Sequence, residues 1–244
     1  MCSGGTKPLI GIIVQARLDS TRLPNKILKE LVTGQTVLCY LLSRLSTCKY
    51  ADKVIVATTT SSKDDTLAQW LKDNNYVYYR GSEEDCIDRF YYTCKHFNVD
   101  LIVRITSDCP FIVPEIIDDM ILYYVKNRFE IDYLSNRQYT YFPEGLDVEI
   151  FSNKMLEDAV NNANQQKERE HINYFFLSRE HKYKIYYYTH GLGQDYSRFK
   201  LSIDTQEDLD QARHFFTKYG LSLQFSFHEL IAVLSKYERE QKDE

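Results

Sequence analysis

The feature that most constrains this chain is an alternation of short β-branched apolar runs with helical segments. The runs that predict strands occupy residues 10–14, 53–58, 76–79 and 100–105. The helical segments that follow them are expected at residues 37–45, 64–72, 85–97 and 114–126. This order predicts a parallel sheet with right-handed crossovers. We therefore expect an α/β protein.

The second half of the chain is predicted to extend this sheet. Further strands are expected at residues 131–134, 184–189 and 199–203, and helical segments at residues 153–178 and 205–218. Within residues 139–150, apolar Leu146, Val148 and Ile150 alternate with acidic residues, a pattern typical of an edge strand. No long Gly, Ser or Pro linker divides the 244 residues, so one large domain is expected.

Net charge and hydropathy argue against two classes of partner. The formal net charge is -5, whereas a general nucleic-acid-binding protein normally has an excess of Lys and Arg. No apolar run approaches the roughly 18 residues needed to span a bilayer. We therefore expect neither nucleic acid nor a membrane as partner, and a small anionic ligand instead.

The six cysteines are scattered along the chain without a CxxC pair. This pattern favours reduced thiols over a disulfide framework or a zinc site. Residues 1–8 lack the apolar core of a signal peptide. The expected location is the cytoplasm.

A polar loop directly follows the first predicted strand. It contains three cations, Arg17, Arg22 and Lys26, and Pro24 forbids a regular helix through it. Open α/β sheets bind ligands at the carboxyl ends of their strands. Guanidinium groups and an ammonium at such a position suit a polyphosphate, although solvated loop residues are an equally simple reading.

Two other strand ends also turn polar. Arg80 and Ser82 follow the third strand and precede a helix, where a glycine turn and a helix cap would explain them as well as ligand binding. Asp108 follows the fourth strand and either caps the turn or binds the Mg²⁺ that accompanies a nucleoside triphosphate. Arg104 could assist the phosphates or pair with Asp108.

The string QARLDSTRLPNK resembles the signature A-R-x-x-S-x-R-L-P-x-K of the cytidylyltransferases that make CMP-activated acidic sugars. These include the CMP-Kdo and CMP-neuraminate synthetases, and the resemblance is closest to the branch of spore coat polysaccharide biosynthesis protein F. In that family the loop wraps the triphosphate of CTP. The resemblance therefore implies that CTP is bound by Arg17, Ser20, Arg22 and Lys26.

Weaker motifs extend the resemblance from about residue 10 to residue 209. RGSEEDCIDRF resembles the segment that encloses the cytosine base, which implies contacts from Arg80 and Ser82. RITSDCP and SIDTQEDLD resemble the segments of two metal-binding aspartates, which implies that Asp108 and Asp204 bind Mg²⁺. The second of these segments departs from the family pattern at Gln206, which stands in place of proline.

The acceptor side of the family cleft is matched by two further segments. YFPEGLDVEIF implies acceptor contacts from Glu144 and Asp147, and REHIN implies contacts from Arg169 and His171. An edge strand and an ordinary helix face are the simpler explanations of these segments.

The resemblance implies a three-layer α/β/α Rossmann-like nucleotidyltransferase fold in a single domain, residues 1–244. Residues 126–189 would form a smaller acceptor and dimerisation lobe of a homodimer. An acceptor oxygen would attack the α-phosphorus of CTP and expel pyrophosphate, for surface polysaccharide or glycan biosynthesis. The implied catalytic residues are Arg17, Lys26, Asp108 and Asp204, which act on the phosphates and the metal.

Other functions have weaker support. A sugar-phosphate nucleotidyltransferase or a GT-A glycosyltransferase would have a GxGTRL-type loop or a DxD motif at a strand end. The chain has no such loop, and its one D-x-D string, Asp208 to Asp210, lies within the helical segment expected at residues 205–218. A non-catalytic nucleotide-binding protein would have no need of both carboxylates and all the loop cations. P-loop chemistry is excluded because the chain has no GxxxxGK[ST] motif.

Overall fold

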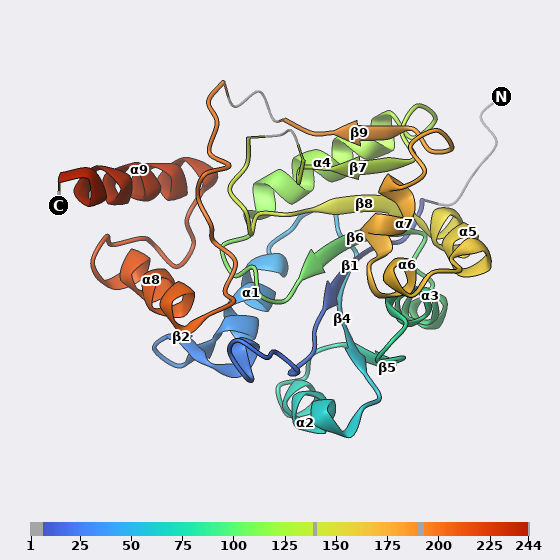
Figure 1. Ribbon diagram of the computed structural model, residues 1–244, viewed down its shortest axis with the longest axis horizontal. Coiled ribbons are helices and arrows are strands. Elements are labelled where there is room, and N and C mark those ends of the chain that lie inside the picture. The colour runs from blue at the N-terminus through green and yellow to red at the C-terminus, as the bar shows by residue number, and fades with distance from the viewer. Residues whose placement is uncertain (1–6, 139–140, 190–192, 244) are drawn as a thin grey trace.

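The computed structural model describes residues 7–138, 141–189 and 193–243. Its main element is a mixed seven-stranded sheet with helices on both faces (Figure 1). Across the sheet the strands are β5 (Tyr78–Gly81), β4 (Lys53–Thr59), β1 (Ile10–Gln15), β6 (Leu101–Thr106), β8 (Glu149–Ser152), β7 (Tyr133–Ser135) and β9 (Ile185–Tyr187). The first four are parallel, β8 is antiparallel to both of its neighbours, and β9 is parallel to β7.

Helices and short elements connect these strands. The helices are α1 (Val37–Leu45), α2 (Asp65–Asp73), α3 (Cys86–Phe97), α4 (Pro114–Lys126), α5 (Asn153–Asn162), α6 (Gln166–Glu170), α7 (Ile172–Leu177), α8 (Gln206–Thr217) and α9 (Phe227–Asp243). The short elements are the 3-10 turns η1 (Lys26–Leu28) and η2 (Ser62–Asp64) and the ribbon of β2 (Glu30–Val32) and β3 (Gln35–Thr36). No helix in the described ranges is long and apolar enough to cross a membrane.

The core consists of one apolar cluster on each face of the sheet. Ile12 and Val14 of β1 pack into the cluster that includes side chains of α1, α4, α8 and α9. Ile13 points to the opposite face, into the cluster with α3, α5 and α7. Because side chains alternate along a strand, a strand covered on both faces is mostly apolar, as β1 is. The expected α/β class and three-layer arrangement are confirmed.

Local sequence signals placed several helix boundaries correctly. Helix α1 begins after Thr36, whose Oγ1 accepts a hydrogen bond from the amide of Cys39 at 3.1 Å. Helix α4 begins at Pro114, where no amide donor is needed. Helix α3 follows Asp85, whose Oδ1 accepts from the amide of Asp88 at 2.8 Å.

Several expectations for the second half of the chain were wrong. Residues 199–203 form no strand, because the segment makes only an isolated bridge between Lys200 and Glu144. Strand β8 is not at an edge: it lies between β6 and β7, and the first two residues of the predicted range 139–150 lie outside the described residues. Residues 153–178 form three helices rather than one, and α9 was not predicted.

Candidate active site

The polar loop lies at the carboxyl end of β1, between two parallel neighbours, β4 and β6. The backbone of the loop is fixed by a buried side chain: the amide of Leu18 donates to the Asp64 carboxylate at 2.7 Å. The Ser20 hydroxyl accepts from the amide of Leu23 at 3.5 Å. The left-handed Asn25, at φ 56°, turns the chain into η1, whose first residue is Lys26. The loop thus presents its cations at the edge of the sheet.

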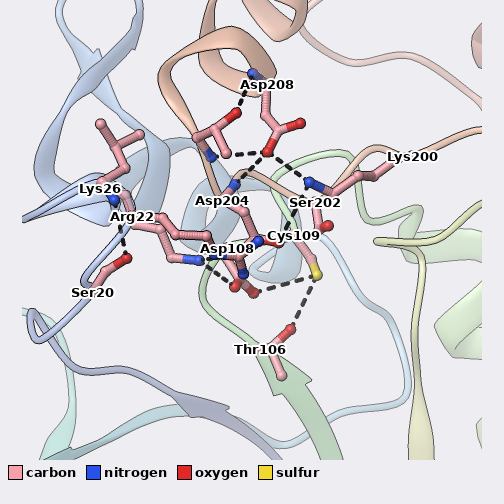
Figure 2. Close-up of polar contacts among 12 residues, drawn as sticks. Ser20, Arg22, Lys26, Thr106, Asp108, Cys109, Lys200, Ser202, Asp204 and Asp208 are labelled. Carbon is pink, nitrogen blue, oxygen red and sulfur yellow. Dashed lines mark hydrogen bonds and ion pairs between the residues drawn. The ribbon is translucent and has the colours of Figure 1, made fainter.

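Lys26 joins two carboxylates that are 96 positions apart in the sequence (204 − 108). Its Nζ lies 2.6 Å from Oδ2 of Asp108 and 2.9 Å from Oδ1 of Asp204 (Figure 2). Arg22 also reaches Oδ1 of Asp204, at 3.0 Å. Burial lowers the pKa of Lys26, but the two carboxylates outweigh burial and raise it above its ordinary value of 10.5. The ammonium is therefore charged at neutral pH.

Asp204 is fixed by the start of α8. The Asp208 carboxylate accepts from the amides of Asp204 and Thr205, both at 2.9 Å, and Thr205 and Asp208 form a capping box. Lys200 lies 2.6 Å from Asp208 and 3.4 Å from the second oxygen of Asp204. Burial raises the pKa of Asp204, but Lys26, Lys200 and Arg22 outweigh it and leave that pKa lowered. This capping box begins the helix without the family's proline at Gln206.

Asp108 and Asp204 fit a magnesium ion held jointly by protein and substrate. Among the described residues there is no group of three His, Cys, Asp or Glu side chains that could hold a metal alone. Mg²⁺ is commonly bound by one or two carboxylates together with substrate phosphates and water. A pair of hard oxygen donors beside a cationic loop meets that requirement.

Three cavities follow one another along this edge of the sheet. The loop cavity, about 410 Å³, is lined by Gln15, Arg17, Asp19, Ser20, Thr21, Arg22, Lys26, Thr106, Ser107, Asp108 and Asp204. The acidic cavity, about 200 Å³, is lined by Arg104, Thr106, Asp108, Cys109, Arg137, Glu144, Asp147, Glu149, Ser202 and Asp204. The helix cavity, about 420 Å³, is lined by Gln15, Arg17, Lys63, Glu83, Glu84, Cys86, Arg89, Glu170 and His171. Shared lining residues make the loop cavity the middle one of the three.

The acidic cavity contains Glu144 and Asp147, two residues singled out from the sequence. The hydroxyl of Ser202 donates to the Glu144 carboxylate at 2.8 Å. Burial raises the pKa of Asp147 to about 6, and nearby Glu149 and Glu144 add to the rise while Arg137 opposes it. Between the two acids, Gly145 has φ +95°, and a Cβ there would lie 2.5 Å from the amide nitrogen of Ser202. Only glycine fits this turn.

Two arginines line the acidic cavity, and the sequence predicted neither the contacts of the first nor the presence of the second. Arg104 pairs with the buried Glu149 and donates to Gln15 Oε1 at 3.0 Å, so it neither pairs with Asp108 nor faces the phosphate loop freely. Arg137 also lines this cavity, and within the described ranges its guanidinium forms no ion pair. Sequence reasoning missed Arg137, since no motif marks it.

Arg169 and His171 do not join the two acids in one cavity. The Arg169 guanidinium donates to the carbonyls of Ala163 and Val160, both at 2.9 Å, and to Asp85 at 3.1 Å. His171 is exposed and lines the helix cavity on the other side of the loop. The four residues implied for the acceptor therefore do not line one cavity, because α6 directs Arg169 toward α5 and α3.

Arg80 and Ser82 likewise make contacts within the protein. Arg80 donates to the carbonyls of Thr59 and Ser61, at 2.8 and 3.0 Å, and pairs with Asp65 at 2.6 Å. The Ser82 hydroxyl accepts from the amide of Asp85 at 3.0 Å. Neither lines one of the three cavities, although the next residues, Glu83 and Glu84, line the helix cavity.

Comparison with known proteins identifies the family. A model described as cytidylyltransferase matches residues 11–241. This chain belongs to the cytidylyltransferase family. The resemblance stated from the basic loop is confirmed, and the protein is a CTP-dependent nucleotidyltransferase. The alternatives of another transferase class and of a non-catalytic nucleotide-binding protein are set aside by this match.

Individual relatives support the family and the fold. The cytidylyltransferase is 36% identical to a cytidylyltransferase from Leptospira borgpetersenii serovar Hardjo-bovis, with a TM-score of 0.89 over 96% of each chain. It is 28% identical to the spore coat polysaccharide biosynthesis protein SpsF of Bacillus subtilis, over 92% of this chain and 93% of the relative. A CMP:2-keto-3-deoxy-manno-octonic acid synthetase complexed with CTP shares the fold, with a TM-score of 0.65 at 14% identity over 86% of this chain and 99% of that one.

Proposed function

We propose that this cytidylyltransferase transfers CMP from CTP to a hydroxyl of an acidic sugar and releases pyrophosphate, in the biosynthesis of a surface polysaccharide or glycan. The acceptor oxygen forms a bond to the α-phosphorus, the bond from that phosphorus to the β-phosphate oxygen breaks, and the hydroxyl proton passes to a base. The observation that carries the proposal is the position of Lys26 between Asp108 and Asp204 at the edge of the loop cavity.

The loop cavity is the proposed site of the triphosphate. Arg17, Ser20, Arg22 and Lys26 line it and supply four hydrogen-bonding groups, three of them cationic. Lys26 and Arg22 would neutralise the charge that develops on the leaving pyrophosphate, while their contacts with the carboxylates keep them oriented. Arg17 lines the helix cavity as well, so it would lie near the ribose.

Asp108 and Asp204 are the proposed holders of the divalent ion, Mg²⁺. When bound, this ion would supply Lewis-acid stabilisation to the phosphoryl group. Both carboxylates also line the acidic cavity, so the α-phosphate would lie where the loop and acidic cavities meet. Asp208 and Lys200 hold Asp204 in place for this role.

The acidic cavity is the proposed acceptor site. Glu144 and Asp147 would accept hydrogen bonds from sugar hydroxyls, and Asp147 could take the proton of the attacking one because its pKa is raised to about 6. Arg137 would bind the acceptor's carboxylate. For Arg169 and His171, the proposed acceptor role is indirect: Arg169 fixes the end of α5, and His171 faces the neighbouring helix cavity.

The helix cavity is the proposed site of the cytosine, and Arg80 and Ser82 would shape its wall through the backbone they hold. We further propose a single domain that functions as a homodimer, with residues 126–189 at the acceptor and dimer side. A cytoplasmic location agrees with the free thiols of the five described cysteines, whereas Cys2 lies outside the described residues.

A pyrophosphate-release assay tests this function. Each of the four nucleoside triphosphates is combined with each member of a panel of acidic, neutral and amino sugars, with Mg²⁺ present. We expect release with CTP and an acidic sugar, and little release when Asp108→Asn replaces the wild type. Release with neutral sugars or sugar phosphates only would contradict the proposed acceptor class.

A further inference from the structure

We propose that Arg89 is a positioning residue that allows the enzyme to distinguish cytosine from uracil. The inference rests on the proposed placement of the nucleobase in the helix cavity. Arg89 lies on α3, is 2% exposed, and lines that cavity next to Glu83 and Glu84. Arg89 belongs to the segment RGSEEDCIDRF, in which the sequence singled out only Arg80 and Ser82.

Arg89 holds the main chain that forms the cavity wall. Its Nη1 donates to the carbonyl oxygen of Ser82 and, at 3.4 Å, to that of Glu83. The same side chain packs on Gly81, where an added Cβ would lie 2.9 Å from Cγ of Arg89. The guanidinium therefore fixes two consecutive carbonyl groups, and each carbonyl oxygen has a second lone pair for another donor.

Arg89 is not held by an ion pair within the described ranges. It takes part in none of the ion pairs between described residues, and its Nε has no hydrogen-bond partner there. Burying a guanidinium without a carboxylate is costly, so a buried arginine that only filled space would be replaced by an apolar side chain at a gain in stability. Ordering the carbonyls at the wall is a role that an apolar side chain could not fill.

Ordered carbonyls favour one pyrimidine over the other. Cytosine presents a 4-amino donor, whereas uracil presents a carbonyl oxygen at the same position, as thymine does. Glu83 lines the cavity, and its carbonyl oxygen can accept from the amino group but repels the uracil oxygen. Arg80 and Ser82, the side chains expected from the sequence to contact the base, are engaged elsewhere. Recognition of cytosine by backbone carbonyls that Arg89 holds in place accounts for the preference for CTP without contacts from these two side chains.

Binding of CTP and UTP to the full-length chain tests the proposal. Calorimetry with Mg²⁺ present should give a CTP preference for the wild type, and Arg89→Met should reduce that preference about tenfold by weakening CTP alone. Arg89→Lys, which keeps the charge but fewer donors, should fall between them. A folded Arg89→Met protein with the wild-type ratio of affinities would overturn the proposal.

A matched control separates positioning from stability. Arg44 is also buried and donates to three carbonyls, those of Ile112, Leu223 and Phe225, but it lines none of the three cavities. Arg44→Met should lower the unfolding midpoint and leave the CTP:UTP ratio unchanged. A similar loss of the ratio in Arg44→Met would mean that general loosening explains the effect, and would overturn the positioning role.

A second variant covers the case in which Arg89→Met does not fold. If Arg89→Met does not fold, Gly81→Ala displaces the same wall by pressing on Arg89, and it should also reduce the ratio. An unchanged ratio of CTP to UTP affinity in Gly81→Ala would contradict the proposal.

The wild type separates this proposal from the proposed function. A wild type that prefers CTP as expected but transfers CMP to no acidic sugar would contradict the acceptor class alone. Equal wild-type affinities for CTP and UTP would overturn the Arg89 proposal itself.

Discussion

Lys26 is the residue on which most of the site converges. Its ammonium contacts both carboxylates in the structure, and the proposed reaction also requires it to stabilise the phosphates. The long flexible side chain allows both, because the loop cavity and the carboxylates lie on the same side of η1.

Replacing Lys26 by Ala should weaken CTP binding. One charge-assisted contact contributes about 1.5–3 kcal/mol, which corresponds to an increase in Kd of about 10- to 150-fold. Calorimetry measures the change, with Lys53→Ala, at the opposite end of β4, as the control. Unchanged affinity in a folded Lys26→Ala protein would remove the loop from the nucleotide site.

Asp108→Asn should reduce turnover more than CTP affinity. A metal that acts on the phosphoryl group is needed most in the transition state, so kcat should fall at least tenfold while Kd changes less. Asp210→Asn on the exposed face of α8, where the carboxylate pairs only locally with Arg213 and Gln206, is the control. Equal losses of kcat and affinity would assign Asp108 to ground-state binding.

The raised pKa of Asp147 should make the stability of the protein depend on pH. Its pKa rises from 3.8 to about 6 on folding, so the folded chain keeps this proton to higher pH than the unfolded chain. Stability should therefore fall as pH rises from about 4 to about 6, by about 3 kcal/mol at most. Asp147→Asn should be more stable than the wild type above pH 6, and the difference should vanish below pH 4. Urea denaturation across this range measures it, and a pH-independent difference would contradict the raised pKa.

At the scale of elements, the position of the segment that precedes α8 depends on the turn at Gly145. Residues 199–203 form no strand, yet Leu201 donates to the carbonyl of Glu144 at 2.7 Å and Ile203 to that of Asp108 at 2.9 Å. These bonds place Asp204 beside Asp108 although the segment is outside the sheet. The approach is possible because Gly145 has no side chain.

Gly145→Ala should therefore disturb both stability and activity. The new Cβ would clash with the backbone of Ser202 and strain a positive φ, so we expect a loss of more than about 2 kcal/mol and a lower kcat. Gly34→Ala is the matched control, because Gly34 also has a positive φ, +77°, with nothing near its Cβ position, and should cost only about 1 kcal/mol. Similar losses of stability in both variants would show that the positive φ alone, and not the contact with Ser202, causes the destabilisation.

At the scale of the whole molecule, the β9 edge of the sheet exposes apolar side chains. Leu122, Phe129 and Tyr186 are 45%, 78% and 43% exposed, on α4, the loop after it and β9. Tyr186 also packs against Tyr123 of α4, with ring centroids 5.1 Å apart. This region overlaps the predicted dimerisation segment, residues 126–189, and contiguous exposed apolar groups are typical of contact surfaces.

We expect sedimentation analysis to show a homodimer that Phe129→Glu weakens at least tenfold. Val77→Glu, which also changes an exposed apolar residue but next to β5 at the other edge of the sheet, should leave the dimer intact (Figure 1). A wild type that sediments as a monomer at micromolar concentration would contradict the predicted homodimer.

The sequence by itself determined the elements whose signals are local. The apolar runs, Thr36 and Pro114 indicated strands and helix starts, because burial on two faces and capping depend on neighbouring residues. The cationic loop and the acids at 108 and 204 could be named for the same reason, since each follows or precedes its element directly. Residues 199–203 were misread because their apolar character reflects packing on the core, not pairing in the sheet.

Only the tertiary structure decided which of these side chains meet. The order β5-β4-β1-β6-β8 brings Asp108 to Lys26 and places Glu149 against Arg104. The backbone bonds of Leu201 and Ile203 bring Asp204 to the same ammonium. It also brings Arg137 into the acidic cavity, whereas Arg169 turns away to cap α5. Contacts between residues far apart in the sequence depend on strand order and on the direction of each helix. The sequence pattern contains neither kind of information, so the charges that face one another in the acidic cavity had to come from the fold.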